Sequence, residues 1–201
     1  MTKRSFAVTY DYRCPFARNV HEHVVAGLGA GADWDVVFSP FSLTQAHVED
    51  GALPVWEDQA KASHLLATEA GLAVRDNWPD RFADVHLALF AARHDEARDL
   101  RDEAVVRDIL RGAGLDDNDV FEAVRGGAPH ATFRKEHEAA VAGHKVFGVP
   151  TFVMGERAVF VRILTRPNGD GVGARATVDH VLDLMSDHAD LNEFKHTTIP
   201  R

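Results

Sequence analysis

One short segment joins a strand pattern to a helix pattern: Asp11-Tyr12-Arg13-Cys14-Pro15-Phe16-Ala17. Before it, residues 5–10 mix aromatic and β-branched side chains, which predicts a short buried strand. After it, apolar side chains recur at three- or four-residue steps, at Ala17, Val20, Val24 and Leu28. This spacing predicts an amphipathic helix with Pro15 in its first turn and glycines at positions 27, 29 and 31 as its stop.

Cys14 therefore stands where the first strand ends and the first helix begins. Unpaired backbone N–H groups and the positive end of the helix dipole favour a thiolate at such a position. Arg13 and Arg18 add positive charge, so we expect the pKa of the thiol to fall from ~8.5 into the range of about 3.5–7.5. From residue type alone, the alternative is a small buried side chain without chemistry. A position followed by Pro15 at a helix start is a poor place for such a packing residue.

The rest of the chain extends this start into an α/β pattern. Residues 34–38 form a second apolar run, and the intervening helix makes the two strands parallel neighbours. From Phe41 to Gly148 the apolar period is helical, which indicates one all-helical block. Within this block the sequence predicts helices over residues 57–70, 79–94, 103–111, 119–124 and 129–144.

The strand pattern resumes after the helical block. Residues 149–154 and 157–163 flank a Gly155-Glu156 turn and predict an antiparallel hairpin. Residues 165–175 are rich in proline and glycine and predict a loop, in which glycines 169, 171 and 173 form a flexible turn. A last helix is expected around the apolar residues Val178, Val181, Leu182 and Met185, before a polar tail over residues 192–201.

Composition excludes several classes of function. The 201 residues carry 22 Lys+Arg against 31 Asp+Glu, and this net charge of −9 disfavours nucleic acid or anionic lipid as a partner. The longest apolar run, residues 146–154, is shorter than the roughly 20 residues that cross a bilayer. The apolar run near the start is too short for a secretory signal. A single cysteine fits a reducing compartment, so we expect a cytoplasmic protein without an internal disulfide.

Two motifs carry a family resemblance: Cys14-Pro15-Phe16-Ala17 after a strand, and Gly148-Val149-Pro150-Thr151 before the next strand. With the helical insertion between them, they resemble the DsbA-like branch of the thioredoxin-fold superfamily, from Phe6 to about Leu184. The resemblance implies an α/β fold with a thioredoxin-like domain over residues 1–40 and 146–201 and a helical insertion over residues 41–145. It also implies that Cys14 lies at the tip of the first helix, beside a cis peptide bond between Val149 and Pro150.

Two groups within this family are similar to parts of the chain. Residues 159–165 and 192–195 resemble an actinobacterial group linked to mycothiol-dependent reduction. The kappa-class glutathione transferases and 2-hydroxychromene-2-carboxylate isomerases share the same plan, and they usually have a serine at the position of Cys14. The chain departs from the oxidoreductase pattern at Ala17, where a dithiol enzyme of this family carries its resolving cysteine. Without a second thiol, an oxidase that donates a stored disulfide is disfavoured.

Three functions stay open at this point. The first is a thiol-disulfide oxidoreductase that uses Cys14 alone, with mycothiol or glutathione as co-substrate and no tightly bound cofactor. The second is a thiol-cofactor-dependent transferase or isomerase, in which Cys14 donates a hydrogen bond to a bound thiolate. The third is a binding protein that has kept the fold without turnover.

The candidate site residues follow from the two motifs and their neighbours. We expect Cys14 and Pro150 to be catalytic. The residues expected to bind the thiol or substrate are Tyr12, Arg13, Pro15, Phe16, Ala17, Val149, Thr151 and Trp56. Trp56 is included because it follows the second strand, where loops commonly hold ligands, although core packing is the more frequent role of such aromatic residues.

No metal site is expected, although the chain has 12 histidines. His21 and His23 are two residues apart and point to different sides of a helix. Histidines 130, 137 and 144 are seven apart, which separates them by roughly 10 Å each along a helix axis. Neither spacing lets two imidazoles reach one ion. The expected partners are therefore a small-molecule thiol and a disulfide or electrophilic substrate, and a homodimer through the helical block is a further hypothesis.

Overall fold

The structure is a computed structural model, and it describes residues 3–198. A mixed four-stranded sheet has the strand order β2-β1-β3-β4. Strands β1 and β2 are parallel, whereas β3 is antiparallel to both β1 and β4. This confirms the predicted α/β class, the parallel first pair and the later hairpin. Residues 1–2 and 199–201 of the predicted thioredoxin-like part lie outside the described residues.

The elements follow the predicted order, with six α-helices between β2 and β3 among the described residues. Their bounds are β1 Arg4–Tyr10, α1 Pro15–Gly29, β2 Trp34–Pro40, α2 Leu43–Ala46, α3 Leu66–Asn77, α4 Pro79–His94, α5 Glu103–Gly112, α6 Asp117–Arg125, α7 Ala128–His144, β3 Thr151–Met154, β4 Arg157–Phe160 and α8 Gly171–Asp187, with a 3-10 helix over Gln59–His64. The boundaries of the predicted insertion, at residues 41 and 145, stay a prediction.

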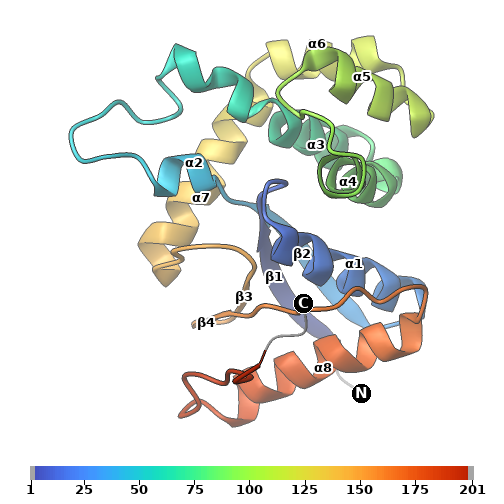
Figure 1. Cartoon of the computed structure of the whole chain (residues 1–201), viewed down its shortest axis with the longest axis vertical. Coiled ribbons are helices and arrows are strands. Elements are labelled where there is room, and N and C mark those ends of the chain that lie inside the picture. The colour runs from blue at the N-terminus through green and yellow to red at the C-terminus, as the bar shows by residue number, and fades with distance from the viewer. Residues whose placement is uncertain (1–2, 199–201) are drawn as a thin grey trace.

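Helices α1 and α8 cover one face of the sheet (Figure 1). Val20 and Val24 of α1 meet Val8 of β1 in a buried apolar cluster to which α8 also contributes. The close approach of α1 to Trp34 depends on Gly27, since a Cβ at that position would lie 2.6 Å from the indole ring. The amphipathic pattern that predicts α1 is thus the pattern that seats it on the sheet.

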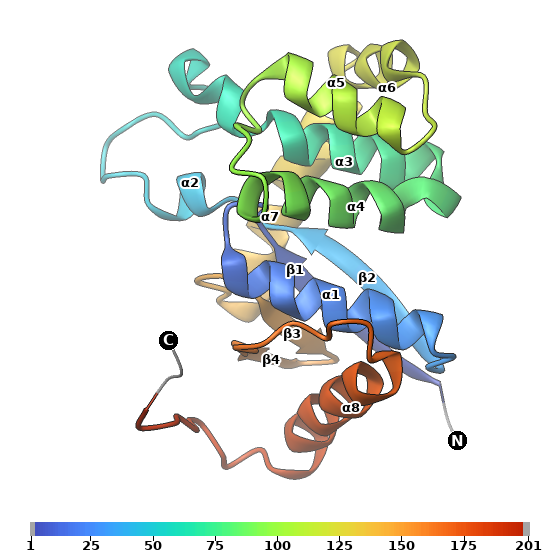
Figure 2. The same ribbon diagram turned by 45° about the vertical axis from the view of Figure 1, so that its right-hand side comes forward.

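The other helices form a block at the end of the sheet where β1 and β2 finish (Figures 1 and 2). A second and larger apolar cluster fills this region, and it contains both Tyr12 and Cys14 together with side chains of the helical block. The segment between β1 and α1 therefore lies at the junction of the sheet and the helices. Within residues 3–198, every helix is too short or too polar to cross a lipid bilayer.

The helix predicted over residues 57–70 is wrong in its bounds. Residues 59–64 form a 3-10 helix, which Asp58 caps by accepting a hydrogen bond from the amide of Ala60 at 3.0 Å. Helix α3 begins only at Leu66 and continues to Asn77. It ends there because Pro79 disfavours a helical backbone at the residue before it, Trp78.

Two predictions near the C-terminal end also need correction. The predicted loop over residues 165–175 ends at Asp170, because its carboxylate caps α8 by accepting a hydrogen bond from the amide of Gly173 at 2.8 Å. Glycines 171 and 173 hence lie in the first turn of a helix. Strand β4 stops at Phe160 and not at residue 163, and the amide of Val161 donates instead to the carbonyl of Pro150 at 3.1 Å.

Candidate active site

Cys14 is the N-cap residue of α1, directly after the turn that follows β1. Its sulfur makes two hydrogen bonds at 3.4 Å. The amide of Ala17 donates to Sγ, and the thiol donates to the carbonyl oxygen of Val149. The side chain is almost covered, with a residue exposure of 9%. The predicted position of the thiol at the helix start is confirmed, and the second motif is brought into contact with it.

The second motif is held against the end of β1. The peptide bond between Val149 and Pro150 is cis. The amide of Thr151 donates to Oγ1 of Thr9, and Oγ1 of Thr151 donates to the carbonyl of Gly148, both at 2.8 Å. These bonds fix the loop before β3 beside the Cys14 turn. The structure thus unites residues that stand more than a hundred positions apart.

The expected low pKa of Cys14 is not what the structure indicates. Burial raises the pKa of the Cys14 thiol because it disfavours the charged thiolate. The backbone amides of Ala17 and Phe16 act in the opposite direction, as the position at a helix start predicts. Their effect is smaller than that of burial. The hydrogen bond to Val149 also requires the protonated thiol as its donor.

The two arginines expected to favour the thiolate are paired with carboxylates. Arg13 lies 3.3 Å from a carboxylate oxygen of Asp11, and Arg18 lies 2.7 Å from one of Asp95. Asp11 in turn raises the pKa of the thiol. The positive charge that lowers it comes from Arg162. The predicted source of the positive field was therefore wrong.

The geometry of a thiol at a helix start beside a cis proline agrees with the sequence comparison. A family model described as the DSBA-like thioredoxin domain matches residues 7–164. The chain belongs to the DSBA-like thioredoxin domain family. This confirms the resemblance stated from the two motifs. A comparison with curated proteins found no match.

Solved structures with the same fold include different chemistries. A DsbA from Pseudomonas aeruginosa is 19% identical, with 94% of this chain and 86% of that chain covered and a TM-score of 0.60. The cytosolic disulfide reductase DsbM from the same organism, solved with GSH, is 16% identical, with 90% and 100% covered and a TM-score of 0.61. A 2-hydroxychromene-2-carboxylate isomerase is 14% identical, with 94% and 100% covered and a TM-score of 0.62. At these identities the likeness concerns the fold.

Within this DSBA-like domain, position 17 is occupied by a fully buried alanine. Its amide is engaged with Sγ of Cys14, and the chain has no other cysteine. A disulfide within one chain therefore cannot form. Any disulfide at this site joins Cys14 to another molecule.

Among the remaining predicted site residues, Tyr12, Pro15 and Phe16 lie next to Cys14 in the chain, whereas Trp56 lies apart from it. Pro15 and Phe16 lie in the first turn of α1, and Phe16 is half-buried. Tyr12 is buried, with its hydroxyl 2.8 Å from Nδ1 of His86. Trp56 lies in a different buried cluster, where its ring packs against Phe133, so its predicted role as a wall of the Cys14 site is not supported. Its apolar surroundings in the helical block explain this placement.

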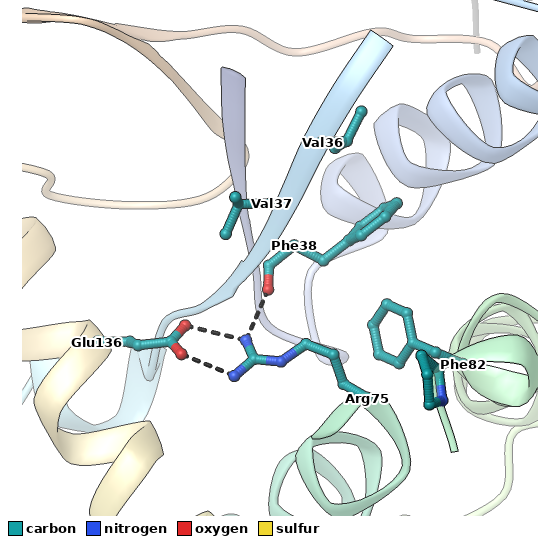
Figure 3. A pocket seen from close by; sticks show the side chains of 7 residues that line it. Val36, Val37, Phe38, Arg75, Phe82 and Glu136 are labelled. Carbon is teal, nitrogen blue, oxygen red and sulfur yellow. Dashed lines mark hydrogen bonds and ion pairs between the residues drawn. The ribbon is translucent and has the colours of Figure 1, made fainter. Parts of the chain in front are cut away.

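Two cavities lie near the sheet. One, of about 360 Å³, lies at the outer edge of β2, where Arg75 bridges Glu136 and the carbonyl of Phe38 (Figure 3). Cys14 does not line it. The other, about 330 Å³, lies between the Asp11–Arg13 segment, the start of α3 and the residues that follow α4. It adjoins the turn before Cys14 through Asp11, Tyr12 and Arg13, although Cys14 itself does not line it.

Three residues of the site were missed by the sequence analysis. The carboxylate of Asp11 accepts hydrogen bonds from the amides of Arg13 at 2.9 Å and Leu43 at 2.8 Å, which ties the Cys14 turn to the start of α2. The side-chain amide of Asn19 donates to the carbonyl of Ile163 at 3.0 Å. Arg162 is the third. Asp11 stands beside the motif and was the one residue a local pattern could have indicated, as a polar cap of the turn.

The raised pKa leads to a prediction for alkylation. At pH 7, iodoacetamide is expected to modify Cys14 more slowly than it modifies free cysteine, because both burial and a small thiolate fraction limit the reaction. The rate is expected to rise about tenfold per pH unit and to level off only above about pH 8.5. Mass spectrometry of the intact protein measures this without assignment, since Cys14 is the only cysteine. A plateau below pH 8 would contradict the raised pKa.

Proposed function

We propose that the chain is a thiol-disulfide oxidoreductase that acts through Cys14 alone, with a low-molecular-weight thiol supplying the second sulfur. The observation that carries this proposal is the placement of one thiol at the start of α1, in contact with Val149 and beside cis Pro150, with a buried alanine at position 17. Membership of the DSBA-like family supports the reaction class. The absence of a second cysteine supports the single-thiol form.

The proposed cycle has two exchange steps that balance in atoms and electrons. In the first, the Cys14 thiolate attacks the disulfide between a substrate and a small thiol. A bond forms from Sγ to the small-thiol sulfur, the original S–S bond breaks, and the substrate sulfur leaves as a thiolate and takes up a proton. In the second, another small thiol attacks the mixed disulfide as its thiolate and releases Cys14. Over the two steps, one free small thiol is consumed, the substrate sulfur is reduced to a thiol, and the two small-thiol sulfurs leave as their symmetrical disulfide.

A second candidate function is favoured by one specific observation. The thiol of Cys14 has a raised pKa and donates a hydrogen bond in the free protein. A donor of this kind also suits a transferase or isomerase, in which the protonated side chain stabilises the thiolate of a bound cofactor. The 2-hydroxychromene-2-carboxylate isomerase among the structures with this fold gives this candidate an example on the same scaffold.

The partners of the proposed reaction remain proposals as well. Mycothiol and glutathione are the two candidate co-substrates, and neither needs to stay bound between cycles. A pool of reduced small thiols occurs in the cytoplasm, and one cysteine per chain fits that compartment. No nucleic acid or membrane partner is proposed, in line with the net charge of −9. The homodimer stays a hypothesis.

The test of the proposed function is the formation of a mixed disulfide. After incubation with an excess of oxidised glutathione, the intact mass of the wild-type protein is expected to increase by one glutathionyl group. Reduced glutathione is then expected to restore the original mass. Because Cys14 is the only cysteine, Cys14→Ala is the matched control and is expected to show no adduct.

Either of two results would remove the proposal. One is a wild-type protein that forms no adduct with oxidised glutathione or with a small neutral disulfide even at alkaline pH, where the thiolate fraction of Cys14 is larger. The other is an adduct that small thiols fail to release, because the second exchange step would then be missing. Both results are read from intact-mass spectra taken before and after the thiol is added, so the two steps are judged on the same sample.

A further inference from the structure

The segment after β4 places Arg162 beside the first turn of α1, over the ring of Phe16. On one side of it, the amide of Val161 donates to the carbonyl of Pro150 at 3.1 Å. On the other side, the carbonyl of Ile163 accepts from the side chain of Asn19 in α1 at 3.0 Å. Arg162 is therefore held between the cis-proline loop and the helix whose first turn presents Cys14. Two backbone anchors make this position a built feature of the site.

The guanidinium group of Arg162 rests on an aromatic surface. Its central carbon lies 5.2 Å from the ring centre of Phe16 and 5.9 Å from that of Phe160. The ring centre of Phe160 in turn lies 5.3 Å from that of Phe147, a residue that is 72% exposed. Stacking on aromatic faces holds a guanidinium while its N–H groups stay available at the edge of the plane.

Arg162 differs from the other arginines around the site in having no acidic partner within the described part of the chain. Arg13, Arg18 and Arg166 each lie within ion-pair distance of an aspartate or glutamate. Arg162 is exposed, and its charge opposes, by a small amount, the rise that burial causes in the pKa of the Cys14 thiol. An exposed guanidinium that lies over Phe16 in the first turn of α1, next to Cys14 in the chain, and has no acidic partner among the described residues, is a receptor for an anionic group on the molecule that reacts at Cys14.

We propose that Arg162 selects the small-molecule partner of Cys14 by binding a carboxylate on it. This inference rests on the proposed oxidoreductase function and names the class of disulfide that reacts best, one whose sulfur-bearing fragment carries a carboxylate. Two parallel N–H···O bonds from a guanidinium to a carboxylate fix both distance and orientation. In a protein with a net charge of −9, this local cation offsets a general repulsion of anions. A peptide thiol such as glutathione fits this receptor, and an uncharged sugar-linked thiol such as mycothiol does not use it.

The test compares two disulfides on two proteins. Oxidised glutathione is the anionic probe, and bis(2-hydroxyethyl) disulfide is the neutral probe. The rate of mixed-disulfide formation is measured for each, and the ratio of the two rates is taken. Arg162→Gln is expected to lower this ratio by about tenfold, whereas Arg162→Lys is expected to keep about half of it, since a lysine retains the charge without the paired bonds. The ratio removes any change in the pKa of Cys14, because that change affects both probes equally.

The matched control is Arg134→Gln, which makes the same change in net charge. Arg134 lies in α7 and is paired with Glu57 and Glu138 on the helical block. Its substitution is expected to leave the ratio unchanged. Salt provides a second measurement: rising ionic strength is expected to lower the ratio in the wild type relative to Arg162→Gln, because the general repulsion is screened equally in both proteins and the attraction to Arg162 is present only in the wild type.

A ratio that is equal in wild type and Arg162→Gln, or a salt dependence of the ratio that is the same in both proteins, would overturn the inference. Neither result touches the proposed function, because Cys14 would still react with both disulfides. If the wild-type protein reacts with neither probe, the proposed function fails, and the role given to Arg162 fails with it. The two failures are hence distinguished by whether the neutral disulfide reacts.

Discussion

With serine at position 14, mixed-disulfide exchange is expected to fall by about a thousandfold or more. A serine hydroxyl is a very poor nucleophile toward sulfur and is not ionised at neutral pH, whereas a thiol reacts through its thiolate fraction even when its pKa is raised. The substitution changes one atom in a nearly buried position, so the turn after β1 and the start of α1 should be preserved. The rate of glutathione release from a mixed disulfide with a small thiol, followed by absorbance in a coupled assay, measures the loss.

The same variant separates the two candidate chemistries. Serine still donates a hydrogen bond, so a transferase or isomerase that uses position 14 as a donor should keep a large part of its activity in Cys14→Ser. Cys14→Ala removes the donor and is expected to lower such an activity further. The conjugation of glutathione to 1-chloro-2,4-dinitrobenzene is a suitable probe for this alternative. If Cys14→Ser exchanges disulfides at a rate near that of the wild type, Cys14 is not the nucleophile. Thermal unfolding of both variants shows whether the fold is intact.

The features of the site that a local pattern determines were predictable. Cys14 lies at the helix start because a strand pattern, a proline and a helical period follow one another within a few residues. The cis peptide bond before Pro150 was implied by the family resemblance, and the structure has it. The periodic pattern predicted helix boundaries less well where a single capping aspartate sets the first residue of the helix, as Asp58 and Asp170 do.

The features that depend on distant residues were not predictable. The thiol of Cys14 meets the carbonyl of Val149, which is 135 positions away, and the burial that raises its pKa comes from the packing of the whole junction. A sequence motif at a helix start indicates only the backbone amides and the helix dipole, which lower the pKa of the thiol. Arg162 was missed for the same reason. Its position follows from the hydrogen bonds of its two neighbours, from Val161 to the carbonyl of Pro150 and from the side chain of Asn19 to Ile163, and not from any pattern around residue 162.

A buried chain of hydrogen bonds behind the site was also hidden from the sequence. The hydroxyl of Tyr12 lies 2.8 Å from Nδ1 of His86, and Nε2 of His86 lies 2.8 Å from Nδ1 of His21. Nε2 of His21 lies 3.2 Å from the carbonyl of Thr9, which only accepts. Each imidazole must therefore donate from Nε2 and accept at Nδ1, with Tyr12 as the first donor. This arrangement satisfies every member only while both histidines are neutral.

Acid is expected to destabilise the protein by protonating the two histidines of this chain of hydrogen bonds. Burial lowers the pKa of His21 to about 3 and lowers that of His86 well below its usual range. In the unfolded chain both would titrate near pH 6.5, so the unfolded state binds more protons below that pH. The stability contributed by the neutral imidazoles is complete above pH 6.5 and is lost as the pH falls toward the folded pKa. From His21 alone, the free energy of unfolding is expected to drop by about 3 kcal/mol between pH 7 and about pH 4.5.

Urea unfolding at a series of pH values measures this loss, because the slope of the unfolding free energy against pH counts the protons taken up. His86→Gln removes one buried imidazole and should give a protein that is less stable at pH 7 but has a shallower slope below pH 6.5. His180→Gln is the matched control, since His180 is exposed on α8 and lies outside this chain of hydrogen bonds. Equal unfolding free energies at pH 7 and pH 4.5 in the wild type would contradict the prediction. The hydrogen-bonded chain would then accept a proton without breaking. Its link between Tyr12, which lies in the turn before Cys14, and Thr9, whose side chain holds the cis-proline loop, would not depend on the charge of its histidines.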